Sequence, residues 1–280
     1  MALSEREQDV YKKIKDWERQ LHEYDASDFE KTYDKLIERS FNRLSPTAQE
    51  KFYSLLDNWL FHLHALLQGS QFQIEARQRI INTARLQYPH IHDITDLRSL
   101  PIEQLVYIAE QEIAKHRLYS FAQGGLTGTG GILLLSADIP LMTIINLRIV
   151  QLLSLIYGYE VNAPYEMMTS LKVFHASTLP KRLQRVGWNN LIQELEEDVE
   201  SSFWYGGNDQ LTDETWIDLP LKQMLKATFI LMFRRKLYQG IPLIGVGIGA
   251  GMNYSLTRQV TQFAHHYYQL RYLSEREDWE

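Results

Sequence analysis

The segment FAQGGLTGTGGILLLSADIPLMTIINLRIVQLLSLIYGY, residues 121–159, is the longest apolar run in the chain. Asp138 and Arg148 are the charged residues within it. Glycine costs a helix about 1 kcal/mol relative to alanine. The glycines that open the run therefore favour either a loop or a helix that packs too closely against its neighbour to admit side chains. These glycines are Gly124, Gly125, Gly128, Gly130 and Gly131.

The second part of this run predicts a helix over residues 139–157. Asp138 is a good N-cap, Pro140 is tolerated in the first turn, and Gly158 suits the end of a helix. The predicted helix is apolar on nearly all sides, which is typical of burial in a protein core or in a bilayer. A membrane span needs ~20 mostly apolar residues, whereas Arg148 costs about 2.5–3.5 kcal/mol to insert. Both environments stay open.

A second glycine-rich segment, GIPLIGVGIGAGM at residues 240–252, precedes the last amphipathic helix. Glycines four residues apart clear one face of a helix, so that another helix can approach closely. We expect this face to pack against the helix that follows Pro140. The segment also fits a loose dinucleotide-binding fingerprint, but that motif requires flanking strands and these flanks look helical. The predicted helix-packing residues are Gly245, Gly247, Gly249 and Gly251.

Helical signals on either side of these segments predict an all-α fold. Ser4 and Glu7 form a capping box, and Pro101 opens the helix that leads into the first glycine-rich segment. In the last helix, apolar residues recur every three or four positions, at Leu256, Val260, Phe263, Tyr267 and Leu270. We therefore predict a single multi-helix domain, residues 1–280, around two glycine-rich apolar central helices. Residues 201–220 are acidic, aromatic and aperiodic, which predicts an irregular insertion.

The composition limits the classes of function. Hydrophobic residues make up 45% of the 280 residues, enough for a sizeable core. The formal net charge of −6 gives no electrostatic reason to expect nucleic acid as a partner. The absence of cysteine excludes disulfides and cysteine-bound metals and suits a cytoplasmic protein. The polar, charged N-terminal residues do not resemble a secretory signal.

Residues that carry chemistry are few. The sequence contains no recognised catalytic motif, and its paired histidines lack the acidic neighbours and the helical spacing of a metal site. We therefore predict no catalytic residue, no cofactor and no metal. Asp138 and Arg148 are candidates for a helix cap or a pocket. The basic triplet Arg234, Arg235 and Lys236, directly before an uncharged span, is a candidate contact with lipid phosphates or an acidic partner.

Two motif blocks resemble the bacterial EcsC family. The first runs from Asp138-Ile139-Pro140 through Arg148 to Tyr157-Gly158-Tyr159, and the second from Gly240-Ile241-Pro242 through Gly245 and Gly249 to Asn253-Tyr254. The resemblance extends over residues 5–273, apart from the segment at 201–220. Members of this family often accompany an ABC transporter and have no established biochemical activity. The resemblance therefore implies a helical, membrane-associated accessory protein and supplies no catalytic residues.

Two functions are compatible with the sequence. The favoured one is a non-catalytic accessory or interaction protein, cytoplasmic and peripheral to the cytoplasmic membrane. Its partner would be an anionic membrane surface or a membrane protein such as an ABC transporter. The alternative is a soluble enzyme or small-molecule-binding protein with a pocket near Asp138 and Arg148. The surroundings of these two side chains discriminate between the functions, and the sequence does not indicate an oligomeric state.

Overall fold

The computed structural model describes residues 3–25, 45, 47, 70–128, 132–201 and 242–277. All regular structure within these ranges is helical, which confirms the predicted fold class. The elements are α1 (Glu5–His22), α4 (Gln71–Arg85), the 3-10 helix η1 (Thr95–Ser99), α5 (Ile102–Gly128), α6 (Ile132–Ile156), α7 (Pro164–Thr178), α8 (Lys181–Ser201) and α10 (Pro242–Glu277). The predicted insertion at residues 201–220 lies outside the described residues, except for Ser201 at the end of α8.

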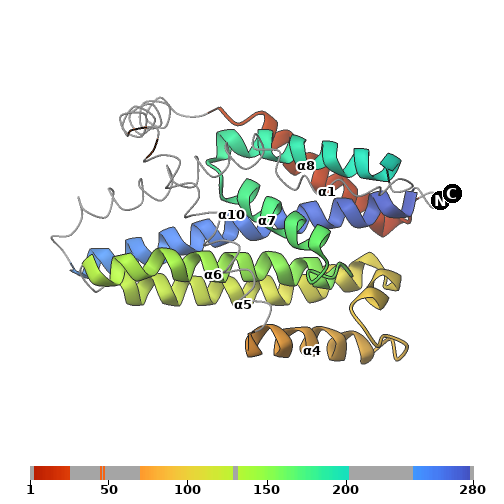
Figure 1. The fold of residues 1–280 in the computed structure, drawn as a ribbon, viewed down its shortest axis with the longest axis horizontal. Helices are drawn as coiled ribbons and strands as arrows, with labels where there is room; N and C mark the ends of the chain where they lie inside the picture. Colours follow the sequence, from red (N-terminus) through yellow and green to blue (C-terminus); the bar gives the residue numbers. More distant parts are fainter. Residues whose placement is uncertain are drawn as a thin grey trace.

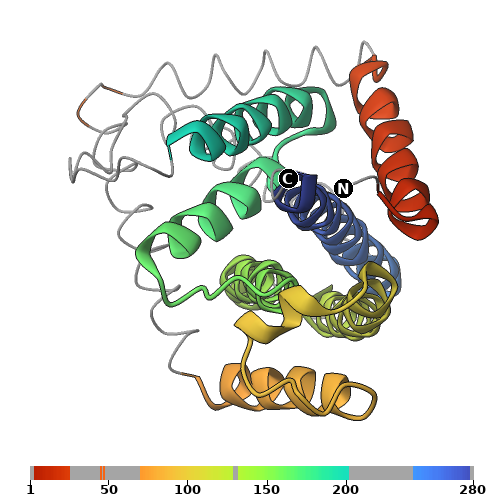
Figure 2. The same ribbon diagram turned by 90° about the vertical axis from the view of Figure 1, so that its right-hand side faces the viewer.

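Helix α10 is the centre of the arrangement, and α5 and α6 lie beside it as two further long helices (Figure 1). The chain runs along α10 in the direction opposite to α5. Helices α7 and α1 pack against α10, α8 packs on both α1 and α7, and α4 lies on α5 and α6 (Figure 2). Helix α10, the last described helix of the chain, therefore contacts α1, the first.

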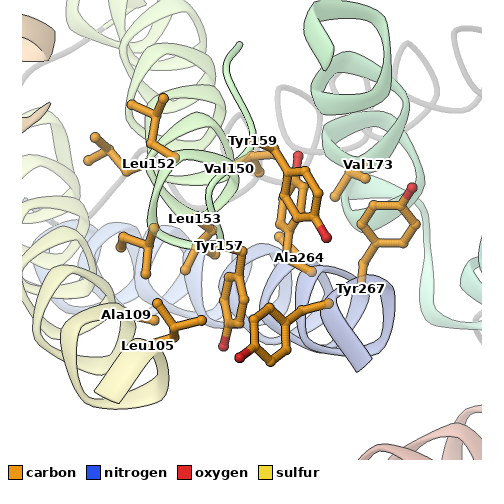
Figure 3. Close-up of a cluster of buried hydrophobic side chains, with 14 of the residues drawn as sticks. Leu105, Ala109, Val150, Leu152, Leu153, Tyr157, Tyr159, Val173, Ala264 and Tyr267 are labelled. Atoms are coloured by element: carbon orange, nitrogen blue, oxygen red, sulfur yellow. The ribbon is translucent and has the colours of Figure 1, made fainter. Parts of the chain in front are cut away.

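The hydrophobic core lies where α5, α6, α7 and α10 meet (Figure 3). Leu105 from α5, Leu153 from α6 and Ala264 from α10 are all fully buried within it. A second part of the core joins α1 and α8 to α10 through aromatic rings. The ring of Trp17 lies 4.8 Å from that of Trp188 and 5.7 Å from that of Phe263, in edge-to-face geometry.

Several predicted helix ends are confirmed. Ser4 and Glu7 form the capping box at the start of α1, and α5 begins directly after Pro101. At the end of α6, Gly158 has a φ of 84°. The amide of Tyr159 donates to the carbonyl of Ser154, as in a Schellman motif. A Cβ at Gly158 would lie 2.4 Å from Cγ of Arg98, so this turn has both a conformational and a steric need for glycine.

The predicted start of the apolar helix is wrong. Helix α6 begins at Ile132, so the backbone at Asp138 is already helical and Asp138 is not an N-cap. The residues before it, with the sequence ILLLSA, are mostly good helix formers. Continuing the helix through them satisfies their backbone groups, and Pro140 removes only its own N–H from that ladder.

The structure does not show the predicted arrangement of glycine-rich helices at the centre of the molecule. Helix α5 ends at Gly128 and α10 begins at Pro242, so the described parts of the glycine-rich segments lie at one end of the three long helices (Figure 1). The packing predicted for Gly251 gains no support, because this residue is exposed and a Cβ built on it meets no atom of the described residues within 4 Å. The positions of Gly245, Gly247 and Gly249 are helical, and their role in packing stays a prediction.

The question of a membrane span has a partial answer. Among the residues that the structure describes, none of the helices combines the length and the apolar character needed to cross a membrane.

Helix α8 was not expected from the sequence. Its residue Gly187 lies very close to α7. A Cβ at Gly187 would lie 2.8 Å from Cβ and 3.2 Å from Cα of Ala176 on α7.

We expect Gly187→Ala to lower stability by about 1–3 kcal/mol through overpacking. Gly251→Ala, the matched control at an open helical position, should raise it by about 1 kcal/mol. Thermal unfolding of both variants tests this, and equal shifts in Tm would contradict the packing of α7 on α8.

The lowered pKa values of two buried histidines predict that the folded protein becomes less stable as the pH decreases. Burial lowers the pKa of His116 and His175 to about 4, from the usual histidine value of 6.5. Between these values the unfolded chain binds protons that the folded protein does not, so the free energy of unfolding decreases as pH falls below 6.5. The slope is at most about 1.4 kcal/mol per pH unit for each histidine. Urea unfolding between pH 7 and pH 5 should show a shallower dependence in His175→Gln, and parallel curves would refute this account.

Candidate functional site

Two cavities stand out in the described part of the chain. One, of about 440 Å³, lies between the start of α1 and the start of α5. Two of its charged side chains are engaged with each other: Arg276 donates to Glu7 at 2.9 Å, and Glu7 also closes the capping box with Ser4. The other, of about 420 Å³, is a groove between α5 and α10. The α5–α10 groove brings two arginines, Arg117 and Arg258, close enough to interact, and it is the candidate site.

The α5–α10 groove is formed by one face of each helix. Its lining residues are spaced three or four positions apart on both helices, so each set shares a face. Because the helices are antiparallel, Arg117 lies near Arg258 at one end, and Glu110 lies toward His265 at the other. The lining consists of Glu110, Ile113, Ala114 and Arg117 from α5 and Arg258, Gln262, His265 and His266 from α10.

Arg117 is half-buried and hydrogen bonds to a neutral group. Its Nε and Nη2 atoms both donate to Oγ1 of Thr261, at 3.0 and 2.9 Å. Burial lowers the pKa of Arg117, and the positive charge of Arg258 lowers it further. Within the described ranges neither arginine forms an ion pair with a carboxylate. The groove therefore has one end where two positive charges lie close together.

The two histidines of the groove are neutral near pH 7. Burial lowers the pKa of His265 to about 3 and that of His266 to about 4. The Nε2 atom of His265 lies 2.9 Å from the Tyr157 hydroxyl oxygen, and Nδ1 of His266 lies 3.2 Å from Oε1 of Gln269. The charge lining the groove therefore comes from the arginines at one end and from Glu110 at the other.

Beyond the arginines, toward the glycine-rich end, the same two helices expose apolar side chains. Leu118 is 64% exposed, Phe121 is 51% exposed and Tyr254 is 39% exposed. The rings of Phe121 and Tyr254 are in edge-to-face contact across the two helices, with centroids 6.5 Å apart. We call Arg117, Leu118, Phe121, Tyr254 and Arg258 the aromatic–arginine face.

The residues singled out in the sequence do not form this site. Arg148 is a half-buried residue of α6 that lines neither the α5–α10 groove nor the other cavity. Asp138 lies within the same helix, at a position whose side chain is outside the description. The triplet Arg234, Arg235 and Lys236 lies outside the described residues. In the part of the chain that is described, no three His, Asp or Glu side chains gather as a metal site would require.

Sequence reasoning missed the groove for an identifiable reason. The spacing of Glu110, Ala114 and Arg117 on one helix, and of Arg258, Gln262 and His266 on another, is visible in the sequence. That spacing shows that each set shares a helix face. It does not show that the two faces meet, because this depends on how α10 packs against α5.

Comparison with known proteins places the chain in a family. The EcsC protein family matches residues 8–273. Two curated proteins of Bacillus subtilis (strain 168) are similar to it. "Uncharacterized protein YdbA" is 24% identical over 98% of this chain and 96% of its own length, and "Protein EcsC" is 28% identical over 64% of this chain and 69% of its own. No solved structure matches. The chain belongs to the EcsC protein family, as its two motif blocks predict.

Proposed function

We propose that this chain is a non-catalytic accessory protein that binds reversibly to the anionic surface of the cytoplasmic membrane. The observation that carries the proposal is the aromatic–arginine face, where exposed apolar rings and cations occur side by side on α5 and α10. A protein–lipid interface favours this combination of groups, because aromatic rings sit at headgroup depth and cations lie near the phosphates.

The magnitudes favour reversible attachment. Each cation near an anionic leaflet contributes about 1 kcal/mol, and salt screens that attraction. Phe121 and Tyr254 add apolar surface, which contributes about 25 cal/mol for each Å² removed from water. Because Leu118, Phe121 and Tyr254 are only partly exposed, their combined gain is limited. Attachment of this kind is sensitive to both salt and lipid charge.

A membrane protein is the second partner that we propose, on the basis of the family resemblance. An ABC transporter is the class that this resemblance implies. The basic triplet Arg234, Arg235 and Lys236, which lies outside the described residues, is proposed as a further contact with lipid phosphates.

A second candidate function is small-molecule binding by a soluble protein. The α5–α10 groove favours it, since a cavity of about 420 Å³ falls within the range of ligand sites. This cavity is in a different place from the pocket expected near Asp138 and Arg148.

Co-sedimentation with vesicles tests the membrane proposal. The protein should pellet with phosphatidylglycerol vesicles at low salt, and it should not pellet with phosphatidylcholine vesicles or at high salt. The double variant Phe121→Ser and Tyr254→Ser should bind about tenfold more weakly, because it removes apolar surface from the interface. Changing the triplet to alanine should also weaken binding.

Tyr11→Ser is the matched control, since Tyr11 on α1 is 39% exposed, as is Tyr254, and lies outside the aromatic–arginine face. This variant should bind as the parent does. The proposal is wrong if no vesicle pellets the protein, or if Tyr11→Ser is as damaging as the double variant.

A further inference from the structure

The α5–α10 groove is polarised along its length. Arg117 and Arg258 line one end, the neutral amide of Gln262 lies next along α10, and Glu110 lies two helical turns before Arg117 on α5. The histidines His265 and His266 carry no charge near pH 7. An anion in this groove is therefore attracted to the arginine end and repelled from the end that holds Glu110.

The arginine end has donors for which the described residues provide no acceptor. A guanidinium has five N–H donors and no acceptor. For Arg117 the hydrogen bonds in the structure run to a single acceptor, the hydroxyl of Thr261, and they involve Nε and Nη2. Arg258 adds a second, exposed guanidinium, and its positive charge repels that of Arg117. An acceptor with negative charge placed between them would relieve this repulsion and use the remaining donors.

We propose that the arginine end of the α5–α10 groove binds a phosphate group, with Arg117 and Arg258 as its principal ligands. Phosphate has several oxygens that match the forked donors of arginine, and its charge matches two cations. Gln262 supplies a further donor from the adjacent turn of α10. The part of the ligand that extends toward Glu110 must be neutral or cationic.

The phosphate comes either from a lipid headgroup or from a free phosphate ester, because the same donors recognise both. The inference that a lipid headgroup supplies the phosphate rests on the proposed membrane function, since the arginines belong to the aromatic–arginine face. Binding of a free phosphate ester does not depend on that function. The binding chemistry at the arginines is the same in the two cases, so it can be measured without a membrane.

Isothermal titration of the full-length chain with inorganic phosphate and with glycerol 3-phosphate, at constant ionic strength, tests the site. Arg258→Gln should weaken binding by about tenfold or more, since it removes charge-assisted hydrogen bonds. Glu110→Gln should tighten binding, because it removes a repelling carboxylate. Arg185→Gln, an exposed arginine on α8, is the matched control and should bind as the parent does.

Arg117 contacts α10 directly, so its variants need a check on folding. Arg117→Lys keeps the charge but lacks the forked donors, and it should bind phosphate more weakly than the parent while unfolding as cooperatively. The inference is overturned if phosphate releases no heat and does not raise the Tm, or if Arg258→Gln and Arg185→Gln have the same affinity as the parent.

Vesicle binding by the same variants separates this inference from the proposed function. If Arg258→Gln loses binding to both phosphate and phosphatidylglycerol vesicles, the lipid headgroup is the source of the phosphate group. If phosphate binds and no vesicle does, the site stands with a free phosphate ester as ligand, and the membrane function fails. If vesicle binding depends on Phe121 and Tyr254 but phosphate has no effect, the membrane function stands and the phosphate site is refuted.

Discussion

The position of α10 depends on one buried ion pair. The guanidinium of Arg271 donates to both carboxylate oxygens of Glu166 on α7, at 2.7 and 2.6 Å, and both side chains are almost fully buried. Burial by itself would lower the pKa of Arg271, but the hydrogen bonds that Arg271 donates to Glu166 outweigh burial and raise that pKa. Removing either partner would leave a buried charge, which typically costs about 3–5 kcal/mol. The pair therefore holds α10 at one position along α7.

One member of this pair also contacts the turn after α6. The guanidinium of Arg271 lies 3.8 Å from the centre of the Tyr159 ring, and Arg98 lies 4.5 Å from the same centre. Arg98 donates to the carbonyl of Gly158 at 3.1 Å. The turn at Gly158 thus places an aromatic ring in contact with two cations, one from η1 and one from α10. With α10 fixed in this way, Arg258 is aligned with Arg117 across the α5–α10 groove.

Local signals in the sequence predicted local structure well. The capping box at Ser4, the start of α5 after Pro101 and the end of α6 at Gly158 each depend on a few neighbouring residues, and all are found in the structure. Asp138 carries an equally good cap signal, but the helix runs through it because the apolar residues before it are also helix formers. The groove was beyond prediction, since α5 and α10 are far apart in the chain and their contact depends on tertiary packing. The same holds for Gly187, where a Cβ atom would collide with Ala176 on another helix.

The central place of α10 has a consequence for how the protein is made. Ribosomes synthesise α1, α5, α6 and α7 before α10, and α10 packs against all four of them. Until α10 emerges, the apolar faces that it covers, including those around Leu105 and Leu153, have no partner from that helix. Contacts between segments so distant in sequence form slowly because closing long loops costs entropy. The nascent chain therefore exposes apolar surface that promotes aggregation until α10 has been synthesised. A chaperone would protect the chain most during that interval.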